Sequence, residues 1–185
     1  ILIAFSSKSF FKGKISQFLF FTLIITTSLV AQDSFENSFS GWTNVSGIGD
    51  EFDWTNDQGG TPSGNTGPST GAPGNWYMYI ETSNPRVEND KAWLEKVYDF
   101  RGRKNAQISF NFHMFGATTG TLNVYVNDNG VLTQIFTLSG DQGNNWFTAN
   151  PIDLSAFDGK NVKIRFEGIR GTSFTGDIAI DNVNV

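Results

Sequence analysis

Apolar and polar residues alternate along most of this chain. In the segment ISFNFHM (108–114), every second residue is apolar: Ile108, Phe110, Phe112 and Met114. A period of two is typical of a β-strand with one buried face, whereas an amphipathic helix repeats its apolar residues every three or four positions. The same alternation recurs in TLNVYVN (121–127) and VKIRFEG (162–168). The sequence therefore predicts an all-β domain.

Short runs rich in Asn, Asp, Ser and Gly separate the alternating segments. They are NDNG (127–130), SGD (139–141) and FDGK (157–160). Such residues favour turns, since Gly and Asn accept positive φ and Asp hydrogen-bonds its own backbone. Strands joined by short turns pair antiparallel. The expected fold is a jelly-roll sandwich of two antiparallel sheets, of the concanavalin or lectin type.

The last predicted strand contains an irregularity. Ile178 and Ile180 occupy even positions, but after Asp181 the apolar residues are Val183 and Val185. This change of parity predicts a β-bulge near Asp181, because a simple register slip would turn the apolar face outward. Bulges often lie beside functional sites, so Asp181 is a candidate site residue; a plain irregularity is the alternative.

The N-terminal region belongs to a different class of sequence. Three lysines precede the apolar run Phe18–Val30, and the small residue Ala31 follows it. A basic segment, an apolar segment shorter than the ~20 residues of a membrane span and a small residue are typical of a secretory signal peptide. The sequence predicts a helical signal peptide over residues 1–32, with a retained membrane anchor as the alternative. The predicted secreted or cell-surface domain covers residues 33–185.

Charge and cysteine content narrow the function. The chain has 13 basic and 18 acidic residues, and three lysines but no acids precede Asp33, so residues 33–185 carry a formal charge of −8. An acidic surface repels phosphate backbones, which disfavours nucleic-acid binding. The chain has no cysteine, so an exported domain must be stabilised by its core or by a bound metal rather than by disulfides.

Several segments are informative when they are taken together and in order: FDW (52–54), TPSGNTGPST (61–70), FHMFG (112–116) followed by GTLNVYV (120–126), and IAIDNV (178–183). In this order they resemble the MAM domain, the extracellular module named after meprin, a neuropilin-type protein and a receptor tyrosine phosphatase. The resemblance covers Phe35–Val185. It implies a jelly-roll sandwich and makes the Gly-, Pro- and Thr-rich stretch at 59–75 an ordered internal loop rather than a linker.

The chain departs from the animal members of that family in one respect. Those domains usually carry paired cysteines, one of them in the segment matching Phe39–Trp42, whereas this chain is similar to the cysteine-free prokaryotic members. Five tryptophans are the predicted substitutes, since a buried aromatic side chain removes about 150–250 Å² from water. They are Trp42, Trp54, Trp76, Trp93 and Trp146.

No familiar catalytic motif is present in the sequence. The only histidine, His113, has no second imidazole or HExxH motif for zinc, and no Gly-x-Ser-x-Gly elbow presents a nucleophile. We expect His113 to be structural. A glycosidase would need two suitably spaced carboxylates beside a sugar-binding cleft, and no strand face carries paired glutamates. The chain is therefore predicted not to be an enzyme.

Acidic residues gather near the two ends of the predicted domain. If the terminal strands lie side by side, as is common in a jelly roll, the two acidic groups meet and repel unless a cation lies between them. Oxygen ligands of this kind suit Ca²⁺. We therefore predict a structural Ca²⁺ held by Glu36, Asp53 and Asp181, with Asp50 as a fourth ligand. The alternative is that these carboxylates are ordinary solvated or turn-capping groups.

Two functions of different classes remain. The resemblance implies a non-catalytic interaction or adhesion module of a secreted or cell-surface protein. Its expected partner is an extracellular protein or glycan, homophilic association included, and larger relatives of this kind can carry a protease or another hydrolase. The alternative is a jelly-roll carbohydrate-binding module accessory to a secreted hydrolase. The orientation of the tryptophans distinguishes the two, because a sugar-stacking platform requires exposed rings.

Overall fold

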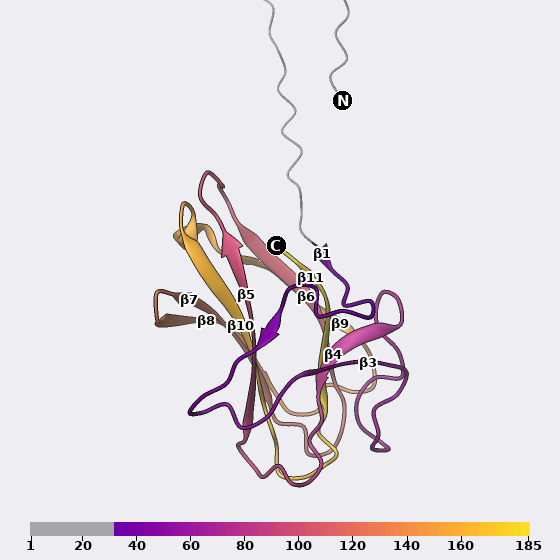
Figure 1. The fold of residues 1–185 in the computed structure, drawn as a ribbon. Helices are drawn as coiled ribbons and strands as arrows, with labels where there is room; N and C mark the ends of the chain where they lie inside the picture. The colour runs from indigo at the N-terminus through magenta and orange to yellow at the C-terminus, as the bar shows by residue number, and fades with distance from the viewer. Residues whose placement is uncertain (1–31) are drawn as a thin grey trace, which may run out of the picture.

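The computed structural model describes residues 32–185, and these residues form two antiparallel sheets (Figure 1). One sheet has the order β3 (Thr55–Gln58), β4 (Trp76–Ile80), β11 (Ile178–Asn184), β6 (Gln107–Met114) and β9 (Phe147–Asp153), with β1 (Gln32–Asp33) also paired to β11. The other has the order β2 (Thr43–Asn44), β5 (Lys91–Asp99), β10 (Asn161–Ile169), β7 (Thr121–Asp128) and β8 (Val131–Ser139). A short 3₁₀ helix, Ser155–Phe157, is the only helix in this part of the chain.

These two sheets confirm the predicted all-β fold. The predicted signal peptide lies outside the described residues. Within residues 32–185, no helix has the length and apolar character needed to cross a membrane.

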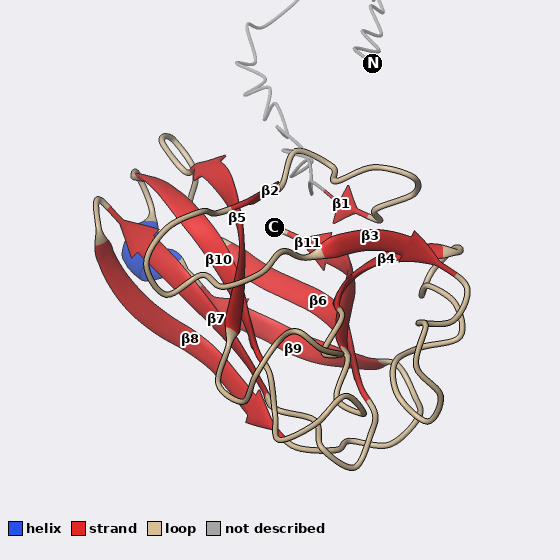
Figure 2. Cartoon of the chain, turned by 60° about the horizontal axis from the view of Figure 1, so that its bottom comes forward, coloured by secondary structure: helices blue, strands red, loops and turns tan. Residues whose placement is uncertain are grey.

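The core lies between the facing sheets (Figure 2). The alternating residues of the three segments are buried as predicted: Ile108, Phe110, Phe112, Met114, Leu122, Val124, Val126, Val162, Ile164 and Phe166. Aromatic rings join the two sheets, because Phe110 on β6 meets Phe166 on β10 edge to face at 5.0 Å between ring centroids. Trp42 packs on the same ring at 5.2 Å. The interior is therefore filled by interlocking aromatic side chains, which add favourable edge-to-face contacts to the burial of apolar area.

The two ends of the described chain are neighbours, as the sequence predicts. β1 pairs with β11 through Gln32 opposite Asn184 and Asp33 opposite Val183. The register of β11 against β6 shifts between Asp181 and Asn184, which confirms the predicted irregularity. Asn182 has a φ of 50°, a left-handed conformation that Asn tolerates better than most residues. This residue lets both halves of β11 keep their apolar side chains in the core.

A buried polar cluster fixes the N-terminal strand. The Asp33 carboxylate lies 6% exposed and accepts hydrogen bonds from Trp42 Nε1 at 2.9 Å, Lys96 Nζ at 2.7 Å and Tyr98 Oη at 3.0 Å. Burial and the adjacent Asp33 charge raise the pKa of Tyr98, so its hydroxyl remains a donor. The segment Phe39–Trp42 is thus tied to β1 by the Trp42 hydrogen bond and by Lys96, which pairs with Asp33 and donates to the Ser40 carbonyl.

Residues 59–75, which we call the covering loop, lie on the outer face of the six-stranded sheet. Tyr77, Tyr79 and Ala179 form a second small apolar cluster on that face, with Trp146 packed against it. The loop is fastened by hydrogen bonds along its length: Tyr77 Oη to the Gly59 carbonyl, Asp177 N to Thr66 Oγ1, Trp146 Nε1 to the Thr70 carbonyl and Ala72 N to Asp181 Oδ2. The Gly-, Pro- and Thr-rich stretch is therefore an ordered layer of the domain rather than a linker.

Candidate functional site

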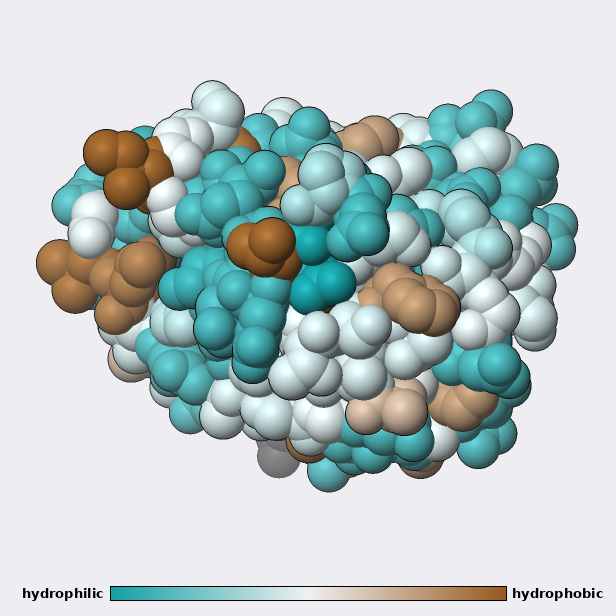
Figure 3. All heavy atoms as spheres, turned by 90° about the horizontal axis from the view of Figure 1, so that it is seen from below, coloured by the Kyte–Doolittle hydropathy of each residue, from teal (hydrophilic) through white to brown (hydrophobic). Residues whose placement is uncertain are grey.

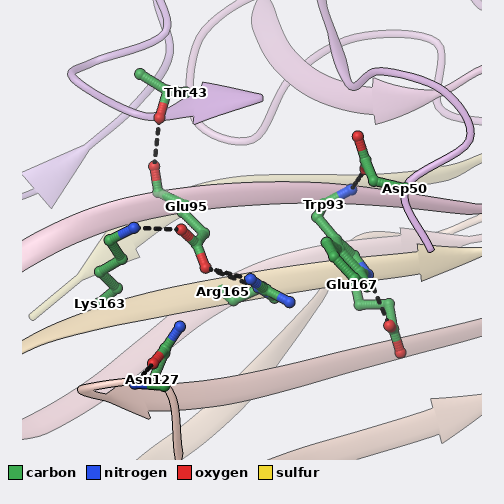
Figure 4. Close-up of polar contacts among 9 residues, drawn as sticks. Thr43, Asp50, Trp93, Glu95, Asn127, Lys163, Arg165 and Glu167 are labelled. Carbon is green, nitrogen blue, oxygen red and sulfur yellow. Dashed lines mark hydrogen bonds and ion pairs between the residues drawn. The ribbon is translucent and has the colours of Figure 1, made fainter. Parts of the chain in front are cut away.

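Polar and charged side chains line the outer face of the five-stranded sheet. They come from alternate positions of β5, β10 and β7, whose intervening residues are buried in the core. The ladder places Trp93, Glu167 and Asn123 in one row, and Glu95, Arg165 and Tyr125 in the next. We call this surface the β5–β10–β7 face and define it by eight residues: Trp93, Glu95, Asn123, Tyr125, Asn127, Lys163, Arg165 and Glu167. Figure 4 shows the part around Glu95 and Trp93.

Glu95 is the centre of an ion-pair network on this face. Arg165 Nε donates to Glu95 Oε1 at 2.7 Å, and Lys163 Nζ donates to Oε2 at 3.0 Å (Figure 4). Burial alone would raise the pKa of Glu95, but the hydrogen bonds from Lys163 and Arg165 outweigh it and lower the pKa. Glu95 is therefore a fixed anion that holds two cationic side chains in place.

Glu167 organises the neighbouring row. Its Oε2 accepts from Trp93 Nε1 at 2.7 Å, and its Oε1 accepts from Asn123 Nδ2 at 2.9 Å and Tyr125 Oη at 3.3 Å. The Arg165 guanidinium lies 4.1 Å from the centroid of the Trp93 ring, within range of a cation–π contact. Both carboxylates of the face are thus saturated by donors, and the Trp93 ring is already occupied.

A turn at the edge of β5 extends the face. Val45 N donates to the Trp93 carbonyl, and Asp50 Oδ1 accepts from Trp93 N at 2.7 Å. Burial raises the pKa of Asp50 to about 6; the Trp93 N–H opposes this shift and the neighbouring Asp53 adds to it. At the tip of this turn the Ile48 side chain is fully exposed. An apolar side chain therefore projects beside a charged, pre-ordered surface.

The two glutamates at the centre of the face suit recognition better than proton transfer. A general acid needs a carboxyl group whose pKa lies near the working pH, whereas the pKa of Glu95 is lowered and Glu167 accepts several hydrogen bonds. The sheet has fixed these groups in one arrangement before any ligand arrives, which reduces the entropy cost of binding.

The four predicted metal ligands lie in two separate pairs. Asp50 and Asp53 lie beside β5 of the five-stranded sheet, whereas Glu36 and Asp181 lie at β11 of the six-stranded sheet. Within residues 32–185, no group of three or more His, Cys, Asp or Glu residues is arranged to hold a metal ion. The structure thus brings together Glu36 and Asp181 and leaves Asp50 and Asp53 elsewhere.

Glu36 and Asp181 meet at the end of the covering loop. Asp181 is fully buried; its Oδ2 accepts from Ala72 N at 2.6 Å and its Oδ1 from Asn182 N at 2.6 Å. Glu36 Oε1 accepts from Asn75 N at 3.1 Å. Burial, with a smaller contribution from the charge of Glu36, raises the pKa of Asp181 to about 7. Asp181 is buried whereas Glu36 is exposed, and their carboxylates provide the type of oxygen that Ca²⁺ binds.

None of the tryptophans offers an exposed stacking platform. Trp42 and Trp54 are buried, and the other three are partly covered. Trp146 packs against Tyr77 and donates to the Thr70 carbonyl, and the Trp93 ring carries Arg165. His113 is buried on β6 with Nε2 3.1 Å from Asn144 Oδ1, and burial lowers its pKa.

Sequence reasoning did not identify the β5–β10–β7 face. The available signal was the charge at alternate positions of two predicted strands, Glu95 in one and Lys163, Arg165 and Glu167 in the other. Alternation shows that these residues share a side of their own strand. It does not show that the strands are neighbours or that opposite charges meet.

Comparisons with known proteins agree with this architecture. The sequence profile of the "MAM domain, meprin/A5/mu" family matches residues 34–185. Over 148 residues the chain is 42% identical to "MAM domain-containing glycosylphosphatidylinositol anchor protein 1" of Gallus gallus, an alignment that covers 74% of this chain and 15% of that protein. Protein 2 of the same name from Mus musculus is 38% identical over 154 residues, covering 74% of this chain and 16% of that protein. The chain thus corresponds to a small part of these relatives.

Solved structures share the fold at low sequence identity. The K3 cleaved adhesin domain of Lys-gingipain from Porphyromonas gingivalis has a TM-score of 0.61 and 14% identity, covering 83% of this chain and 97% of that one. The carbohydrate-binding module TmCBM61, solved with β-1,4-galactotriose, has a TM-score of 0.56 and 18% identity, covering 82% and 92%. At such identities these likenesses concern the fold alone.

Proposed function

The chain belongs to the MAM domain family, and we propose that it is a non-catalytic extracellular module that binds another protein. The relatives are named as glycosylphosphatidylinositol anchor proteins, which places our proposal at the cell surface. The β5–β10–β7 face is the binding surface of this proposal. The proposal rests on the preformed network around Glu95 and Glu167. This network holds positive and negative side chains in fixed positions before a partner binds.

Homophilic association is the form of this function that is simplest to test. Lys163 and Lys91 have side chains 51% and 39% exposed, and both pair with glutamates on the sheet. A second copy of the chain presents the same face, so an isologous contact would place the exposed Lys163 and Ile48 of each copy against the surface of the other.

The test uses beads coated with the domain and scored for aggregation. We expect the wild-type domain to cluster beads and Lys163→Glu to abolish clustering, with Lys104→Glu as a control of equal charge change on an exposed turn outside the face. Equal clustering by wild type and Lys163→Glu would remove the face from the proposal. The absence of any clustering would exclude the homophilic form.

A glycan is the second candidate ligand, supported by a polar strip on the same face. Asn123, Tyr125 and Asn127 lie in a row of amide and hydroxyl groups along β7, and such groups can hydrogen-bond sugar hydroxyls. Against this stands the absence of an exposed tryptophan among the five, since sugar rings usually stack on aromatic faces. Binding to a defined polysaccharide on a glycan array, lost in Asn123→Ala, would favour this alternative.

We further propose that Glu36 and Asp181 hold a structural Ca²⁺. The ion would supply only charge neutralisation, joining the segment after β1 to β11 and to the covering loop. Gly74 supports the geometry, because its φ is 87° and a Cβ there would collide with the Glu36 carboxylate. Asp50 and Asp53, which lie at the other sheet, are not part of this site.

A further inference from the structure

A second carboxylate pair lies at the opposite end of the covering loop. β4 and β11 pair through Ile80 opposite Ile178, and both side chains point into the core. The next residues along the two strands are Glu81 and Asp177, so alternation directs both toward the outer face, which the loop covers. Cross-strand neighbours of this kind have Cβ atoms about 4.5–5.5 Å apart. The pair is separated from Asp181 by the rest of β11.

One oxygen of each carboxylate has no hydrogen-bond partner. Asp177 is fully buried; its Oδ1 accepts from Thr82 N at 3.0 Å and Thr82 Oγ1 at 2.9 Å, whereas its Oδ2 has no partner. Glu81 Oε1 accepts from Ser83 N at 2.9 Å, and the buried Oε2 has none. A buried carboxylate oxygen without a partner is costly, and two beside each other also repel.

Neither Arg170 nor Arg86 donates a hydrogen bond to Glu81 or Asp177, and the buried Nε of Arg86 has no hydrogen-bond partner in the described chain. Arg170 Nε donates to the Thr82 carbonyl at 2.7 Å, and Arg86 lies over the Phe52 ring at 5.1 Å. No ion pair to Glu81 or Asp177 is formed within residues 32–185. Burial raises the pKa of Asp177 and the charge of Glu81 adds to it, which is the expected response of an acid without a counter-ion.

Neutral oxygens surround the pair. Thr82 Oγ1 is 3.0 Å from the Phe174 carbonyl, and Thr66 Oγ1 accepts from Asp177 N at 2.8 Å. Thr61 Oγ1, also near Asp177, donates to the Thr66 carbonyl at 3.2 Å. Hydroxyl, carbonyl and carboxylate oxygens from the covering loop, the segment after β4 and the segment before β11 therefore lie around Asp177.

We propose that Glu81 and Asp177 bind a Ca²⁺ ion beneath the covering loop, at a site separate from Glu36 and Asp181. Ca²⁺ accepts six to eight oxygens in flexible geometry and completes its shell with carbonyls, hydroxyls and water. Two carboxylates with free oxygens balance its charge. The ion ties residues 61–66 of the loop to β4 and to the segment preceding β11, so the loop is fastened at both ends by oxygen clusters.

The test is a Ca²⁺ titration of the protein by calorimetry after chelation and dialysis. We expect Glu81→Gln to lose one class of site or to bind there at least tenfold more weakly. Glu36→Gln should retain that class and affect only the other. Asp57→Asn serves as a control, because Asp57 is a β3 carboxylate outside both pairs. Glu81 makes only one hydrogen bond, so its amide variant should fold even if Asp177→Asn does not.

Three outcomes would overturn the proposal. Ca²⁺ binding by Glu81→Gln that matches wild type in stoichiometry and affinity excludes the site. The second outcome is that Glu81→Gln leaves Ca²⁺ binding unchanged but removes a step in which the stability of the wild-type protein falls with rising pH. That result would indicate that the two carboxylates share a proton instead of binding a cation. Loss of binding in Glu36→Gln alone would leave only the first site.

Discussion

At the scale of single residues, this domain depends on acidic side chains that are buried and must be matched. Asp33 has three donors, Glu95 has two cationic partners, and Asp177 and Asp181 lie under the covering loop. A buried carboxylate that has cationic or hydrogen-bonding partners stabilises one arrangement of the chain. Burial without enough such partners raises the pKa of the carboxyl group.

Asp33→Ala should destabilise the domain by about 3–5 kcal/mol, because it removes one member of a buried pair and leaves Lys96 and two other donors without their acceptor. Urea denaturation followed by tryptophan fluorescence measures the change. Asp99→Ala is the matched control: Asp99 pairs with Arg101 on the surface, with side chains 49% and 69% exposed, and its loss should leave the midpoint almost unchanged. Similar midpoints for the two variants would contradict the assignment.

The stability of the chelated protein should fall as pH rises from about 4 to about 7. The pKa of Asp181 is raised to about 7 in the folded state, so folding favours its protonated form and this contribution is lost as the group ionises. Asp50, with its pKa raised to about 6, acts in the same direction. Denaturation in EDTA across this range, for wild type and Asp181→Asn, measures the slope. An equal slope in both proteins would show that Asp181 is not responsible.

At the scale of elements, the covering loop and β11 act as one unit. β11 pairs with β1, β4 and β6, and its outward side chains at positions 177 and 181 receive hydrogen bonds from segments on either side. The loop has no strand of its own in residues 59–75, so side chains and carbonyls fasten it in place of a ladder. Figure 3, seen from below, shows apolar side chains in separate groups among hydrophilic ones.

Thr66→Val should destabilise the domain by about 1–3 kcal/mol, although it preserves shape. Thr66 Oγ1 accepts from Asp177 N and donates to the Phe115 carbonyl at 3.0 Å, so valine leaves the buried Asp177 N–H without a partner and leaves the Phe115 carbonyl with Gly67 N as its donor. Ser69→Ala, at an exposed position of the same loop, is the control. Limited proteolysis should cut the loop faster in Thr66→Val alone. A loss below about 0.5 kcal/mol would mean that the loop is held elsewhere.

At the scale of the whole molecule, the outer faces of the two sheets differ. The covering loop packs on the outer face of the six-stranded sheet, whereas on the β5–β10–β7 face Lys163 is exposed and Glu95 and Arg165 of the same network are buried. The two faces therefore divide structural and recognition roles in our proposal. Both carboxylate pairs lie on the covered side, so cation binding there should change stability without altering the recognition face.

Ca²⁺ should raise the melting temperature of the wild-type protein relative to EDTA. A ligand at 100 times its dissociation constant adds about 2.7 kcal/mol per site to folding stability. Scanning calorimetry of wild type, Glu36→Gln and Glu36→Gln combined with Glu81→Gln should show a stepwise loss of this gain. An unchanged melting temperature in EDTA would contradict both cation proposals. Equal gains in all three proteins would place the ion elsewhere.

Alternation and turn residues in the sequence determined the strands, the buried face of each strand and the bulge near Asp181. These features are local, since a side chain's face follows from its position within its own strand. The order of the sequence motifs was specific enough to indicate the family. The covering loop was predicted as an internal element for the same reason, because the segments on both sides of it match one domain.

Only the tertiary structure decided which charges meet. Asp50 and Asp181 both belong to acid-rich segments, yet they lie at different sheets. Glu81 and Asp177 are far apart in the sequence, yet the β4–β11 register makes them neighbours. The β5–β10–β7 face arises in the same way from three strands that are distant in sequence. Pairing between strands depends on the packing of all of them at once, so it is not encoded in any single segment.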